Sequence, residues 1–78
     1  MSTQKVVYCA EFTRQKHEAY LYVAGSKGVI KKFEGDIGSP ASLINEIINY
    51  IETERMAEVL SFSFSPNGPL FILAKVFS

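Results

Sequence analysis

Five stretches of the chain have the side-chain pattern of strands, most clearly where Leu60, Phe62 and Phe64 alternate with Ser61, Ser63 and Ser65 at a period of two. That period places successive side chains on opposite faces of a strand. It predicts β-strands over residues 6–12, 19–24, 29–34, 58–65 and 70–77. In the last of these stretches only Lys75 interrupts an apolar run. Two apolar faces are typical of a central strand or of a strand buried in an interface.

Between residues 34 and 58 the apolar period changes to that of a helix. The apolar positions with this spacing are Leu43, Ile44, Ile47, Ile48 and Ile51. They form one stripe, as expected of a helix that packs on a sheet. Ser39 and Pro40 mark its start, because serine caps helices and proline fits the first helical position. We expect the helix to fade near residues 53–55.

The order β-β-β-α-β-β predicts one α+β domain over residues 1–78. Short turns should make the first three strands an antiparallel meander. A strand–helix–strand crossover usually returns parallel, which would place the fourth strand beside the first. We therefore expect a five-stranded mixed sheet, ordered 3-2-1-4-5, with one helix packed on one face. Lys31 and Lys32 give the short third strand the charge of a protected edge.

Composition and charge narrow the functional classes. The chain is 47% hydrophobic and carries no net charge, which indicates a folded domain without the strong basic surface of a general nucleic-acid binder. Its longest apolar run, residues 70–74, is too short to cross a bilayer, and no signal peptide is recognisable. We expect a cytoplasmic protein with no membrane association. The single cysteine, Cys9, should be buried and structural.

Candidate catalytic and metal-binding residues do not form a complete set. Glu11 and Glu46 occupy strand and helix positions that resemble those of two metal-binding carboxylates in the ribonuclease H topology, but the fourth strand ends in serines where a third acid is needed. His17 lacks companion ligands, and residues 25–28 fit a hairpin turn better than a phosphate loop. We expect a chain that is not an enzyme and has no metal or cofactor.

Apolar side chains of the last two strands predict self-association. One helix covers only part of one sheet face, so a monomer would expose a large apolar patch. In the order 3-2-1-4-5 the last strand is also an edge, which invites strand pairing. The expected contact residues are Leu60, Phe62, Phe71, Leu73 and Phe77. We expect a protein-interaction or regulatory module that forms a two-fold homodimer, edge to edge or, preferably, by stacking of open sheet faces.

A second hypothesis is binding of single-stranded nucleic acid. Tyr8, Tyr20 and Tyr22 lie on neighbouring expected strands, and Lys31 lies on the next one. On a common exposed face these residues would make an aromatic platform with a basic rim, on which bases stack. Tyrosines that face the helix would instead belong to the core.

Overall fold

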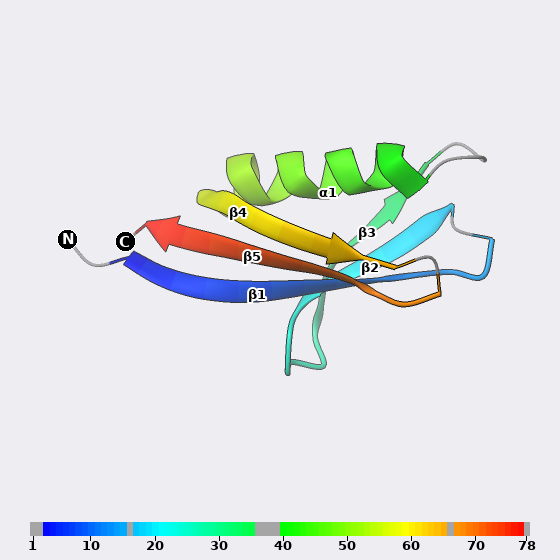
Figure 1. Cartoon of the computed structure of the whole chain (residues 1–78), viewed down its shortest axis with the longest axis horizontal. Coiled ribbons are helices and arrows are strands. Elements are labelled where there is room, and N and C mark those ends of the chain that lie inside the picture. Colours follow the sequence, from blue (N-terminus) through cyan, green and yellow to red (C-terminus); the bar gives the residue numbers. More distant parts are fainter. Residues whose placement is uncertain (1–2, 16, 36–39, 66, 78) are drawn as a thin grey trace.

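In the computed structural model the described part of the chain forms a five-stranded sheet with one helix across one face (Figure 1). The structure describes residues 3–15, 17–35, 40–65 and 67–77. The elements are β1 (Thr3–Phe12), β2 (Glu18–Val23), β3 (Val29–Glu34), α1 (Pro40–Glu54), β4 (Ala57–Phe64) and β5 (Leu70–Phe77). The predicted element order is confirmed, and Pro40 is the first residue of α1. The predicted cap, Ser39, lies outside the described residues.

The strands lie in the order β3-β2-β1-β5-β4, so the predicted order 3-2-1-4-5 is wrong for the last two. Every neighbouring pair is antiparallel, and the sheet is therefore not mixed. The chain crosses through α1 from the β3 edge to the opposite edge, where β4 lies, and β5 then returns between β4 and β1. This arrangement replaces a parallel β1–β4 pairing by antiparallel pairings, which are slightly more stable.

The central position of β5 explains why both of its faces are apolar. It pairs with β1 on one side and with β4 on the other, so its backbone groups are not free at an edge. The interpretation of residues 70–77 as a central strand is confirmed, and their placement at the sheet edge is wrong. The two edge strands are β3, as predicted, and β4.

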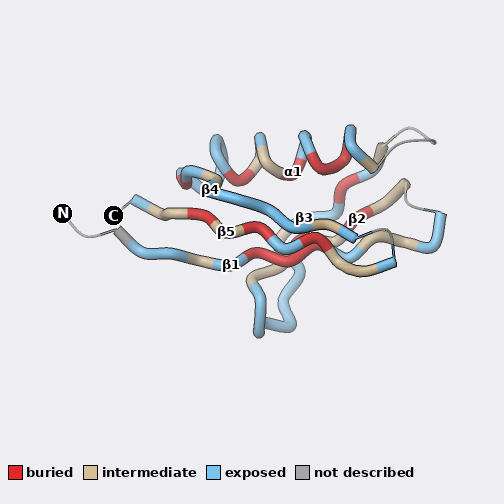
Figure 2. The backbone as a smooth tube through the Cα atoms, in the orientation of Figure 1, coloured by how far each residue is buried: buried red, intermediate tan, exposed pale blue. Residues whose placement is uncertain are grey.

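The hydrophobic core lies between α1 and the sheet (Figure 2). Leu43, Ile47 and Ile51 of α1 are fully buried, and Ile44 is nearly so. Ile48 packs at the margin of this cluster and is half-buried. The predicted apolar stripe of the helix is therefore confirmed.

The register of the strands decides which side chains face α1. Residues directly opposite one another in an antiparallel pair share a face. On the three central strands the helix-side residues are Gln4, Val6, Tyr8, Ala10, Phe12, Ala19, Leu21, Val23, Leu70, Ile72, Ala74 and Val76. The residues that alternate with them lie on the opposite side of the sheet.

The chain leaves α1 through a residue in the left-handed backbone region. Met56 has φ 51°, a conformation that costs an L-residue with a Cβ roughly 1–2 kcal/mol. Its side chain is 71% exposed, so its removal loses little packing. We expect Met56→Gly to raise the free energy of unfolding by about 0.5–1 kcal/mol, because glycine adopts this region without the Cβ clash.

Urea unfolding measures this effect. The matched control is Gln15→Gly, another exposed position, whose φ is outside the left-handed region. It should leave stability unchanged or lower it, because glycine there only adds freedom to the unfolded chain. A Met56→Gly variant no more stable than the wild type would contradict the strain argument.

Candidate interaction surface

The sheet face opposite α1 is not covered by any element of the described chain (Figure 1). We call it the open face. Its residues on β2, β1, β5 and β4 are Glu18, Tyr20, Tyr22, Lys5, Val7, Cys9, Glu11, Phe71, Leu73, Lys75, Phe77, Glu58, Ser61 and Ser63. The open face is thus built mainly by β1 and β5, which hold its side chains in fixed register.

Four apolar side chains cross the middle of the open face. Val7 is the cross-strand partner of Leu73, and Cys9 is the partner of Phe71. We call these four residues the apolar strip. Val7 is 41% and Phe71 46% exposed, although both lie on central strands. A further aromatic side chain, Phe77, is 53% exposed at the end of β5. Contiguous exposed apolar surface of this kind marks interaction sites in soluble proteins.

A short chain of hydrogen bonds joins β1 and β2 within the open face. The Cys9 thiol donates to the Tyr22 hydroxyl oxygen at 3.3 Å, and this hydroxyl donates to Glu11 Oε1 at 2.9 Å. The bond to Cys9, partial burial and the bond to Glu11 together raise the pKa of the Tyr22 phenol above its ordinary value. Tyr22 therefore stays a neutral donor. Cys9 is only 4% exposed, as expected for a structural thiol.

Charged residues of opposite sign flank the apolar strip. Lys5 and Lys75 are cross-strand partners at one end, which we call the basic row, and Glu58 of β4 lies opposite Lys75. Glu11 lies at the other end of the strip, on β1. The open face is therefore polarised along its strands.

We call the end that holds Glu11 the acidic end, and it continues onto the neighbouring strands β2 and β3. Glu18 of β2 and Glu34 of β3 both contact Lys32, whose Nζ lies 3.0 Å from a carboxylate oxygen of each. The hydrogen bond with Glu18, and after it the one with Glu34, raises the pKa of Lys32 above its ordinary value. One lysine thus serves two carboxylates, and this end of the face keeps an excess of negative charge.

The residues expected to contact a partner fall into two groups. Phe71, Leu73 and Phe77 share the open face, as predicted. Phe62 does not, because it lies opposite the buried Ile72 and so faces the helix side. Leu60 lies where the β4 register shifts between Val59 and Ser61, at the sheet edge. Leu60 and Phe62 are 43% and 53% exposed but lie apart from the apolar strip.

Sequence reasoning missed the contribution of β1 to this surface. The signal was present in the alternation of Lys5, Val7, Cys9 and Glu11, which puts a base, two apolar residues and an acid on one face. Alternation groups these four residues on one face but does not show whether the helix covers that face, which depends on how the strands pair.

The four residues of the nucleic-acid hypothesis are not brought together. Tyr8 faces the helix and is 2% exposed, so it belongs to the core. Lys31 lies opposite Leu21 and is also on the helix side. Tyr20 and Tyr22 alone lie on the open face. The predicted platform of three tyrosines with a lysine rim is therefore not formed.

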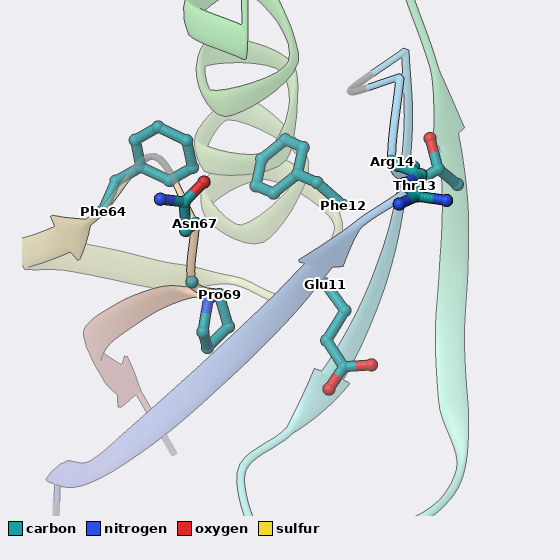
Figure 3. Close-up of a pocket in the computed structure, with 8 residues that line it drawn as sticks. Glu11, Phe12, Thr13, Arg14, Phe64, Asn67 and Pro69 are labelled. Carbon is teal, nitrogen blue, oxygen red and sulfur yellow. The ribbon is translucent and has the colours of Figure 1, made fainter.

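A cavity of about 390 Å³ lies between the β1–β2 and β4–β5 connections (Figure 3). The rings of Phe12 and Phe64 form part of its wall and meet edge to face, with centroids 5.3 Å apart. Arg14 and Asn67 line it as well, whereas the Glu11 side chain points away from the two rings. Its described lining residues offer donors and aromatic surface, and no two of them are arranged as a pair for proton transfer or nucleophilic attack.

Neither a metal cluster nor a membrane-spanning helix is present in the described residues. No three His, Cys, Asp or Glu side chains among them are grouped to hold a metal ion. The described helix is too short and too polar to cross a bilayer. Comparison of the chain with models of protein families, with curated proteins and with solved structures finds no match.

Proposed function

We propose that this chain is a small, non-enzymatic, cytoplasmic protein-interaction module that works as a homodimer through its open face. The observation that carries the proposal is the apolar strip. Its two most exposed members, Val7 and Phe71, keep 41% and 46% of their surface in contact with solvent in the isolated subunit. Removal of apolar surface from water contributes about 25 cal/mol per Å², so covering the strip would stabilise an assembly.

A second copy suits this surface because the open face is complementary to itself. Its basic row and its acidic end lie on opposite sides of the apolar strip. When a second copy is turned end for end, its acidic end faces the basic row of the first copy, and its basic row faces the acidic end. Such charge complementarity favours correct association. Two-fold symmetry is also the commonest form of self-association.

Nucleic-acid binding has less support from the same face. Tyr20 and Tyr22 could stack on bases, but Lys32, the cross-strand partner of Tyr20, is bonded to Glu18 and Glu34. A phosphate would have to displace both carboxylates. Salt-dependent binding to a labelled single-stranded oligonucleotide would be the evidence for this function.

Sedimentation equilibrium tests the homodimer directly. The subunit mass is 8.7 kDa, and we expect an average mass near twice this value at micromolar concentrations. Dilution should lower the average toward the subunit mass, since dimerisation follows mass action. A mass of 8.7 kDa at every concentration would refute the proposed function.

A further inference from the structure

The charged residues of β1 lie at equal distances on either side of the centre of the open face. On β1 the apolar residues Val7 and Cys9 are flanked by Lys5 and Glu11. Residues along a strand are about 3.3 Å apart, so each charge lies roughly 10 Å from the midpoint between Val7 and Cys9. Rotation about that midpoint therefore exchanges the positions of the base and the acid.

The neighbouring strand β5 repeats this arrangement. Lys75 lies beside Lys5, Leu73 beside Val7, and Phe71 beside Cys9. The basic row thus has two lysines, and the apolar strip is two strands wide. On β4 the strip continues into Ser61 and Ser63, which are small and neutral.

Two orientations of a two-fold axis stack the open faces of two copies. A two-fold axis parallel to the strands leaves each residue at the same position along the strand direction. The basic row of one copy would then lie over the basic row of the other. A two-fold axis perpendicular to the strands reverses positions along the strand direction. The lysines of one copy then lie over Glu11 of the other. Like charges in contact are unfavourable and opposite charges are favourable, so the second orientation is selected.

We infer that two copies stack end for end, with the two-fold axis across the strands between Val7 and Cys9. This inference rests on the proposed homodimer and adds the orientation of its subunits. Leu73 then packs against Phe71 of the partner subunit, and Glu11 of each copy meets the basic row of the other. Stacked sheets cross at about 30°, which moves the rows by roughly 5 Å, about one strand spacing. Glu11 therefore stays within reach of both lysines.

Charge reversal tests this orientation. In the proposed stack, position 5 of each copy faces position 11 of the other. A Lys5→Glu homodimer therefore places two glutamates together at both symmetric contacts, and a Glu11→Lys homodimer places lysines together there. We expect the Kd of either homodimer to rise about 10-fold or more. An equimolar mixture of the two variants should form a heterodimer about as tight as the wild type, because both contacts then join opposite charges. Salt should reduce these differences.

The controls separate orientation from net charge. Lys27→Glu and Glu46→Lys change net charge equally at exposed positions of the β2–β3 turn and of α1, and should leave the Kd unchanged. If Glu11→Lys disturbs the fold by losing its bond with Tyr22, Glu11→Gln keeps an acceptor and should still raise the Kd about 3-fold.

The outcomes distinguish the two proposals. Weaker homodimers and a restored heterodimer support the end-for-end stack. A wild-type dimer that tolerates both reversals overturns the orientation and leaves the proposed function standing. A wild-type chain that is monomeric at every concentration overturns both.

Discussion

Ile47→Ala is expected to lower the free energy of unfolding by about 2–5 kcal/mol. Ile47 is fully buried in the middle of α1, where the helix meets the sheet. Truncation removes apolar contacts and leaves a void in a close-packed interior. A chain of this size has a total stability of roughly 4–12 kcal/mol, so the loss is a large fraction of it.

Urea unfolding at one fixed protein concentration measures this loss, because the proposed dimerisation would make stability depend on concentration. Ile48→Ala is the matched control, since it makes the same chemical change at the half-buried next position. It should cost clearly less than Ile47→Ala. A loss below about 0.5 kcal/mol for Ile47→Ala, the range of surface substitutions, would mean that the apolar stripe of α1 does not carry the core.

The strands and the helix could be predicted because each has its own local pattern. The period of two fixed the faces of β1, and the helical period from Leu43 to Ile51 fixed the buried side of α1. The charged edge strand β3 followed from Lys31 and Lys32 in the same way. These features depend on residues a few positions apart in the chain.

The positions of β4 and β5 depend on a choice that local pattern does not make. A short turn after β4 allows β5 to pair on either side of it, and the crossover through α1 is compatible with both orders. Which of the two strands is central can be inferred only by comparing their faces. β5 is apolar on both faces, whereas β4 carries Ser61 and Ser63 on one of them, which suits β5 at the centre and β4 at the edge.

The candidate surface was predictable in part for the same reason. Alternation placed Phe71, Leu73 and Phe77 together, but it groups Leu60 with Phe62, which lies opposite the helix-side Ile72, and Leu60 itself lies at the register shift of β4. A bulge adds one residue to a strand and resets its alternation. The faces of Tyr8 and Tyr22 depend on the register set by the β1–β2 loop, because a shift of one residue exchanges the faces of a whole strand.

Phe71→Asp is expected to dissociate the proposed dimer and to leave the subunit folded. Phe71 lies in the apolar strip, beside Cys9 on β1, and is 46% exposed in the isolated subunit. In a stacked dimer this surface is buried, and a carboxylate there would lose its hydration without gaining a partner. A central aromatic contact is commonly worth about 2–4 kcal/mol, or roughly 30- to 1,000-fold in Kd.

Phe62→Asp is the matched control for this variant, because it makes the same change at a phenylalanine of similar exposure, 53%, on the helix side of β4. Sedimentation equilibrium should find Phe71→Asp monomeric where the wild type and Phe62→Asp are dimeric, with unchanged circular dichroism. If Phe71→Asp fails to fold, Phe71→Ser supplies the comparison, since serine already occupies the cross-strand partner position, Ser63. Dissociation by Phe62→Asp alone would place the contact at the β4 edge, because Phe62 and Phe71 lie on opposite sides of the same sheet.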